Sequence, residues 1–217
     1  MKKLIFLIVS VIILAIPSEA QLVRSRTFGE KEKKGYDRIT VGYDAMFLSD
    51  NLATLNGVTL NYVHGFKISQ SQFFIEIGAS ASFNIEYTDI TKYQLDFYEK
   101  FLNVAIRIPL NFSYKLKLSE VFSLYPFLGP YVKINPHSEG FNEDYHRDYN
   151  SITPLYSRNT LVQGGVEGGV GFTISNFYFG IQYGFDINPR AKWILREKDE
   201  IIKIKTSQLS LNLGVQF

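Results

Sequence analysis

The chain contains no cysteine among its 217 residues. A disulfide scaffold, a thiolate zinc site and a cysteine nucleophile are therefore excluded. A bacterial lipoprotein is excluded too, because its lipid is attached to a cysteine directly after the signal peptide. Strong charge of one sign is also lacking: 23 Lys and Arg against 21 Asp and Glu give a formal net charge of +2. Since no basic stripe interleaved with aromatic residues appears either, nucleic acid is not expected as a partner.

Long hydrophobic runs are absent after the first 20 residues. That opening stretch, MKKLIFLIVSVIILAIPSEA, has two lysines directly after Met1, then an apolar run over residues 4–16, and small residues at positions 18 and 20. This order predicts a secretory signal peptide, residues 1–20, cleaved before Gln21. The alternative, a transmembrane anchor, is disfavoured because a spanning helix needs about 20 apolar residues.

What recurs through the remainder is a period of two. Over residues 177–187 the odd positions are apolar or aromatic, and the even positions are tyrosine, glycine, glutamine or aspartate. Strict alternation of this kind predicts a β-strand with two different faces. Eight such segments occur, near 38–48, 56–68, 72–87, 97–116, 121–134, 161–174, 177–188 and 206–217.

The connections between these segments alternate in length. Short turns are predicted at 69–71, 117–120 and 175–176, and longer loops at 49–55, 88–96, 135–160 and 189–205. All short turns then lie at one end of an antiparallel up-and-down barrel. Short periplasmic turns and long extracellular loops are typical of outer-membrane β-barrels. The predicted organisation is a signal peptide at 1–20, a periplasmic N-terminal segment at 21–37 and an all-β, eight-stranded transmembrane barrel at 38–217.

A soluble eight-stranded barrel is the alternative fold, and the two differ in which face points outward. The polar face of the last three segments is small, rich in glycine and free of lysine. It suits the interior of a narrow barrel, which packed side chains fill. The opposite face, rich in Phe, Ile, Leu and Val, exceeds the few hundred Å² of apolar surface that soluble proteins expose. The faces therefore predict a barrel in contact with membrane lipid.

Aromatic residues on the apolar face gather near the strand ends. Those predicted near the short turns are Phe73, Phe112, Tyr114, Phe122, Phe172, Phe177 and Phe217. Those predicted near the long loops are Tyr43, Phe47, Tyr87 and Phe185. Two such groups are typical of interfacial girdles. The terminal Phe217 also looks like the signal by which barrel-assembly machinery recognises its clients.

Three stretches resemble a known family. FLNVAIRIPLNFSYKLKLSEVFSLYPFLGPYVKI and GGVEGGVGFTISNFYFGIQYGFDINP, together with the final LSLNLGVQF, resemble the PorT-like outer-membrane β-barrels of Bacteroidetes-type bacteria. The likeness covers most of 38–217 and rests on glycine, proline and aromatic placement. It implies an eight-stranded barrel, and the founding member is linked to a protein-secretion and gliding apparatus.

Five charged residues fall on the predicted inner face: Asp44, Glu76, Arg107, Glu167 and Asp186. They could form a charged relay or ion pathway. The favoured interpretation is a structural network in which Arg107 neutralises one or two carboxylates, because buried charges must be paired and eight strands leave no aqueous channel.

The glycine-rich run at 164–171, GGVEGGVG, lacks the Gly-Lys-Ser/Thr ending of a phosphate loop and lies within a strand. It is better explained by close packing, with inward glycines making space for three inward aromatic residues of the fifth segment, Tyr125, Phe127 and Tyr131.

The three histidines do not predict a catalytic or metal site. His64 falls on the outward face near the short turns, and His137 and His146 lie in the longest loop among acidic residues. Their spacing matches no standard metal site, so no metal, cofactor or catalytic residue is assigned.

The sequence leads to one functional hypothesis and two alternatives. The first is a non-enzymatic surface or accessory barrel, including a component of a secretion or envelope assembly, with a protein partner held by the loop Asn135–Asn159. The second is a narrow conduit for a small solute or ion. The third is a rim enzyme that uses His137 or His146.

Overall fold

The computed structural model describes residues 35–49, 52–68, 71–90, 97–139, 154–195 and 201–217. The predicted signal peptide and most of the segment 21–37 lie outside these ranges. The described ranges contain twelve strands: β1 (Gly35–Leu48), β2 (Thr54–Lys67), β3 (Phe73–Ile90), β4 (Phe97–Tyr114), β5 (Leu116–Lys117), β6 (Phe122–Glu139), β7 (Pro154–Asn159), β8 (Val162–Ile174), β9 (Phe177–Asp186), β10 (Ala191–Leu195), β11 (Ile201–Ile204) and β12 (Thr206–Gln216). Within the described ranges, no helix has the length and apolar character needed to cross a bilayer.

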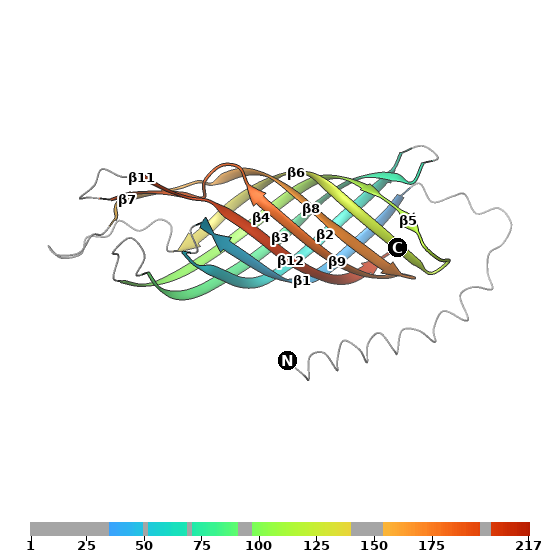
Figure 1. Ribbon diagram of the computed structural model, residues 1–217, viewed down its shortest axis with the longest axis horizontal. Helices are drawn as coiled ribbons and strands as arrows, with labels where there is room; N and C mark the ends of the chain where they lie inside the picture. Colours follow the sequence, from blue (N-terminus) through green and yellow to red (C-terminus); the bar gives the residue numbers. More distant parts are fainter. Residues whose placement is uncertain (1–34, 50–51, 69–70, 91–96, 140–153, 196–200) are drawn as a thin grey trace, which may run out of the picture. The chain divides into compact units, whose positions relative to one another are not determined.

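Eight of these strands form a closed antiparallel barrel (Figure 1). Its strands follow the order β1, β2, β3, β4, β6, β8, β9, β12, and each pairs with its neighbour along the chain. The two-residue strand β5 only extends the turn between β4 and β6. Closure comes from pairing of β12 with β1, where the backbone N–H of Phe217 donates to the Asp37 carbonyl at 2.9 Å. The predicted up-and-down barrel is therefore confirmed.

The short connections lie at one end of the barrel, called here the turn end, and the longer ones at the other, called the loop end. Ser175 and Asn176 alone connect β8 to β9, and Ser175 takes a positive φ of 55°, as two-residue hairpins require. Most predicted boundaries agree with the structure to within three residues. The largest difference is β6, which continues to Glu139 instead of ending near 134.

The outer face of the barrel is an almost uninterrupted apolar band. β9 exposes Phe177, Phe179, Ile181, Tyr183 and Phe185, each between 39% and 49% accessible, while the intervening Tyr178, Gly180, Gly184 and Asp186 are buried. β1, β2, β4 and β12 repeat the pattern. Exposure of such a band to water is unfavourable, whereas contact with lipid is favourable. Closure of the barrel also gives every barrel strand two hydrogen-bonded neighbours, as the lipid interior requires. The barrel is inside out relative to a soluble one.

The predicted aromatic girdles lie on this outer face. At the turn end Phe73, Phe112, Phe177 and Phe217 are exposed, and Tyr114, Phe122 and Phe172 are half-buried. Ring contacts link some of them in pairs, with centroids 4.7 Å apart for Phe73 and Tyr114 and 6.4 Å apart for Phe122 and Phe172. At the loop end Tyr43 and Phe185 are exposed. The side chain of Tyr87 lies outside the described residues.

The loop end carries additional structure that the alternation does not predict. Two of the long connections, 135–160 and 189–205, contain the strands β7, β10 and β11, which form a separate three-stranded sheet in the order β11-β10-β7. Figure 1 shows β7 and β11 extending beyond the ends of the barrel strands. The prediction of plain loops at these two connections is therefore wrong. The connection from β6 to β8 contains β7, and the connection from β9 to β12 contains β10 and β11.

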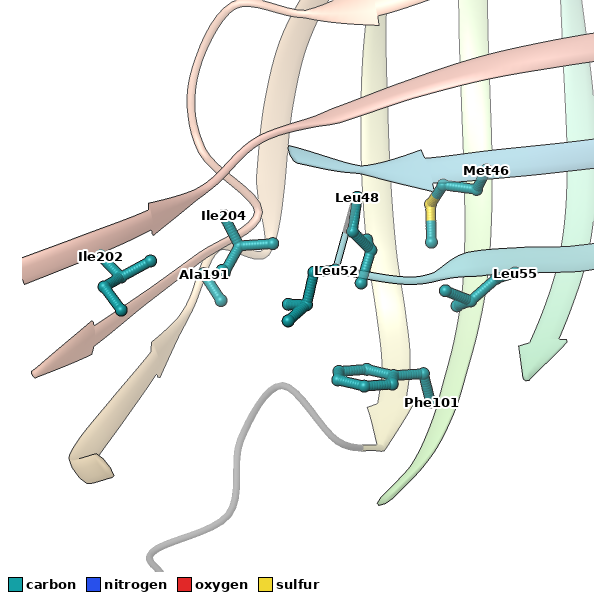
Figure 2. Packing of buried hydrophobic residues seen from close by; sticks show 8 residues of the cluster. All are labelled: Met46, Leu48, Leu52, Leu55, Phe101, Ala191, Ile202 and Ile204. Carbon is teal, nitrogen blue, oxygen red and sulfur yellow. The ribbon is translucent and has the colours of Figure 1, made fainter. Parts of the chain in front are cut away.

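A hydrophobic cluster, aliphatic except for Phe101 and called here the aliphatic cluster, fills the barrel at the loop end (Figure 2). It combines residues from β1, β2, β4, β10, β11 and the first loop: Met46, Leu48, Leu52, Leu55, Phe101, Ala191, Ile202 and Ile204. All are less than 9% exposed. The inward face is therefore apolar in this layer, and the extra sheet packs its own buried face onto it.

Candidate functional site

The lumen holds three ion pairs at different heights between the turn end and the loop end. Arg38 pairs with Glu76 at 2.8 Å near the turn end, and Arg107 pairs with Glu167 at 3.0 Å in the middle. Lys133 pairs with Asp186 nearer the loop end. Each side chain in these pairs is at most 6% exposed. We call these three pairs the lumen ladder.

Alternation along the strands positions every member of the ladder. Arg38 on β1, Glu76 on β3, Arg107 on β4, Lys133 on β6, Glu167 on β8 and Asp186 on β9 all occupy positions whose neighbours in the chain face outward. Because successive side chains of a strand point to opposite faces, the apolar belt and the charged lumen are consequences of the same pattern.

Arg107 connects several strands in the middle of the lumen. Its Nη1 donates to Glu167 Oε2, and its Nη2 donates to Gln208 Oε1 on β12. Glu167 also accepts hydrogen bonds from Asn111 Nδ2 at 2.8 Å and Gln182 Nε2 at 2.7 Å. The carboxylate thus has three donors, which compensates for its loss of water.

Asp44 is satisfied by neutral donors. Asn84 Nδ2 donates to it at 2.7 Å and Ser210 Oγ at 2.5 Å, and Gln208 Nε2 provides a third bond. Gln208 therefore joins Asp44 to Arg107, so that the two belong to one network.

Near the loop end, Asp186 accepts from Lys133 Nζ, Tyr131 Oη and Thr206 Oγ1. Above it, Arg190 lies between β9 and β10, fully buried, and its Nε donates to Asn103 Oδ1 at 3.1 Å. Burial lowers the pKa of Arg190 to about 10, so the group still carries its proton near neutral pH. The buried charges in the described part of the chain are four cations and four carboxylates, so they cancel.

An aromatic cluster lies at the turn end of the lumen. Tyr36, Phe74 and Tyr125 are at most 7% exposed, with the Tyr36 ring centroid 5.1 Å from that of Phe74 and 5.7 Å from that of Tyr125. Tyr36 Oη donates to Glu76, and Gln216 Nε2 donates to Tyr125 Oη at 3.0 Å. The lumen is therefore filled by aromatic rings at one end and by the aliphatic cluster at the other.

Glycines of β8 provide the space for the large inward side chains. A Cβ on Gly169 would lie 2.6 Å from Phe127 Cζ, and one on Gly165 would collide with the Tyr131 ring. Inward residues Tyr125, Phe127 and Tyr131 are buried, as the packing interpretation of GGVEGGVG requires. A Cβ on Gly164, which faces outward, would meet nothing within 4 Å.

Three polar side chains that border a small cavity inside the lumen each have an atom without a hydrogen-bond partner among the described residues. The cavity measures about 30 Å³ and is bordered by Arg38, Arg107, Asn111 and Glu167 among others. Arg38 Nη1, Arg107 Nε and Asn111 Oδ1 have no hydrogen-bond partner among the residues that the structure describes. A cavity of this size accommodates about two water molecules, which is far from a continuous channel.

All five charges named from the sequence are buried in the lumen: Asp44, Glu76, Arg107, Glu167 and Asp186. Three buried cations were missed, namely Arg38, Lys133 and Arg190. The sequence pattern indicates an inward side chain for two of them. Arg38 is an even number of positions from the inward Asp44 on the same strand, and Lys133 is two positions from the inward Tyr131. Arg190 follows the end of β9, where strand parity no longer applies.

The described histidines lie outside the lumen. His64 is half-buried on the outer surface at the turn end, with Nδ1 2.8 Å from Asp37 Oδ1. His137 lies 3.5 Å from Glu139 and is exposed, whereas His146 lies outside the described residues. Ser138, which follows His137 in the chain, accepts a hydrogen bond from Asn159 Nδ2. No group of three or more metal-ligating side chains occurs in the part of the chain that is described.

Comparison with protein-family models found no match, and neither did comparison with curated proteins. Among solved structures, the chain is similar to Neisserial surface protein A, with 15% identity, a TM-score of 0.47 and coverage of 87% of this chain and 100% of that one. It is also similar to Ail of Yersinia pestis, solved with the heparin analogue sucrose octasulfate, with 14% identity, a TM-score of 0.44 and coverage of 85% and 99%. The N-terminal β-barrel domain of Pseudomonas aeruginosa OprF matches at 11% identity, a TM-score of 0.34 and coverage of 84% and 99%. These likenesses concern the barrel fold and assign no ligand or activity to this chain.

Proposed function

We propose that this chain is an integral protein of a bacterial outer membrane: a closed, non-conducting, non-enzymatic barrel that acts through the structures at its loop end. The apolar outer face supports the membrane setting. Orientation follows from the connections, because outer-membrane barrels keep short turns on the periplasmic side. The resemblance to PorT-like barrels is what brings a secretion or envelope assembly into this proposal.

The filled lumen is the observation that carries the proposal. Three ion pairs lie between the aromatic cluster at the turn end and the aliphatic cluster at the loop end. A conduit would require these buried pairs to separate, and breaking a buried pair costs roughly 3–5 kcal/mol in comparable cases. The lumen thus serves stability, and the surface left for a partner is at the loop end.

The stretch between β6 and β7 remains the best candidate for protein contact. Residues 140–153 connect the end of β6 at Glu139 to the start of β7 at Pro154 and contain tyrosines and acidic residues. Because β7 pairs with β10, a partner that binds this stretch would also adjoin the sheet beyond the barrel. The ends of the predicted contact loop Asn135–Asn159 belong to β6 and β7, so the proposed contact surface is its central part, residues 140–153.

Conductance and partner capture test the proposal separately. Purified barrel in planar bilayers is expected to give no stable channels, and reproducible single-channel steps would contradict a closed lumen. Replacing 140–153 by a short Gly-Ser linker should abolish co-purification of cross-linked partners from outer membranes while the barrel still folds. The matched control replaces 91–96, between β3 and β4, in the same way and should retain capture. Equal capture by both variants would overturn the role of this loop.

A further inference from the structure

Three lysines gather on the outward face where the extra sheet leaves the barrel. Lys192 on β10 lies directly opposite Lys203 on β11 in the strand register, and both side chains are exposed. Lys205, also exposed, is the next outward residue after Lys203 along the same ribbon. The register also places Arg158 of β7 opposite Lys192. We call Lys192, Lys203 and Lys205 the rim lysines.

This arrangement is costly without a counter-charge. Residues directly opposite in an antiparallel pair have Cβ atoms about 5 Å apart, and like charges there destabilise the sheet. The rim lysines have no ion pair among the described residues, and the other outward positions of β11 and the start of β12 are Ile201 and Ser207. An anion held close to the rim lysines would offset this repulsion.

The position of the rim lysines relative to the apolar belt indicates the source of that anion. Burial alternates without a break from Ile201 to Asn212, so β11 and β12 share one continuous outward face. Read toward the loop end, that face runs Val215, Leu213, Leu211, Leu209, Ser207, Lys205 and Lys203. On the adjoining strand, Phe185 lies opposite Ser207 and ends the aromatic part of the belt. The lysines thus begin directly where the lipid-facing surface ends, at the depth of lipid headgroups.

We infer that the rim lysines bind the phosphate groups of lipid headgroups in the outer leaflet. This inference rests on the membrane setting and orientation given under the proposed function. Ammonium groups suit this task because each is a compact charge on a flexible stem that reaches an anionic surface. Such contacts would anchor the β7-β10-β11 sheet against the membrane surface and relieve the repulsion between Lys192 and Lys203.

The test uses folded full-length barrel in phosphatidylcholine micelles, titrated with short-chain phosphatidic acid, whose headgroup is a phosphate monoester. Trp193, the single tryptophan, follows Lys192 in the chain and serves as the fluorescence probe, and native mass spectrometry counts the bound lipids. K203Q/K205Q should bind about 25-fold more weakly, about fivefold for each lysine. K67Q/K117Q removes the same charge at the turn end and should bind like the unaltered chain.

Three outcomes would overturn the inference. Equal affinity of K203Q/K205Q and the unaltered chain would show that the rim lysines do not contribute. Equal weakening by K67Q/K117Q would show only a general charge effect. Inorganic phosphate binding as tightly as phosphatidic acid would identify a soluble anion as the ligand. A barrel that failed to fold in phosphatidylcholine, seen by heat-modifiable gel mobility, would instead contradict the proposed function itself.

Discussion

The Arg107 guanidinium lies 3.0 Å from the Glu167 carboxylate, although 60 positions separate the two residues in the chain. Both are buried, and they sit on strands β4 and β8, which are not adjacent but are separated by β6. The contact therefore spans the inward face of β6, and the curvature of the barrel wall brings the two side chains together.

Arg107→Leu should strongly destabilise the folded barrel. Removing the cation leaves the buried Glu167 carboxylate without its charge partner, and such changes cost about 3–5 kcal/mol. The measurement is the temperature at which the compact folded band disappears in heat-modifiable gel electrophoresis. R107L/E167L, which removes both charges, should recover most of the loss. A heat stability unchanged in R107L would argue against the lumen network.

Gly165→Ala should destabilise the barrel, whereas Gly164→Ala should not. A Cβ at Gly165 would collide with the Tyr131 ring and lie 2.6 Å from the Phe185 carbonyl oxygen, while one at Gly164 has open space. Overpacking of this kind costs about 1–3 kcal/mol. Urea unfolding in lipid vesicles gives both free energies, and equal values for the two variants would refute the packing role of the inward glycines.

Leu55→Ala should loosen the loop end. Leu55 is fully buried in the aliphatic cluster, and truncations of such leucines cost about 2–5 kcal/mol. Leu60→Ala on the same strand is the control, because Leu60 is 58% exposed on the outer face. Limited proteolysis of the connections at the loop end should accelerate in L55A and not in L60A. Indistinguishable cleavage would mean that the cluster does not hold the extra sheet.

Phe217→Ala should impair assembly without changing the stability of barrels that have assembled. The backbone bonds between Phe217 and Asp37, 2.9 Å each, do not depend on the side chain. Phe177→Ala on the same rim removes a ring of similar exposure, 46% against 54%, and serves as the control. Outer-membrane levels should fall severalfold for F217A alone. An equal fall in the outer-membrane level of F177A would show that the loss of any girdle ring impairs assembly, and that Phe217 has no special role.

The sequence by itself determined the strands and their two faces. Alternation over 177–187 and 206–217 specifies which side chains share a face, because the side-chain period of a strand is two and does not depend on its partners. Chain order and turn lengths then lead to an up-and-down barrel. The belt residues Ile181 and Leu213 and the lumen residues Glu167 and Asp186 follow from parity alone.

Only the tertiary structure decided which charged side chains of the lumen form ion pairs and which residues cover its loop end. Lys133 and Asp186 are 53 positions apart, and their pairing depends on register and curvature, which no local pattern contains. Met46 and Leu48 continue the inward parity of Asp44, yet they enter an aliphatic cluster because β10 and β11 cover that end. The position of the rim lysines also depends on the tertiary structure. Lys192 lies opposite Lys203 only because the connection between β9 and β12 folds into the paired strands β10 and β11, which the alternation pattern does not predict.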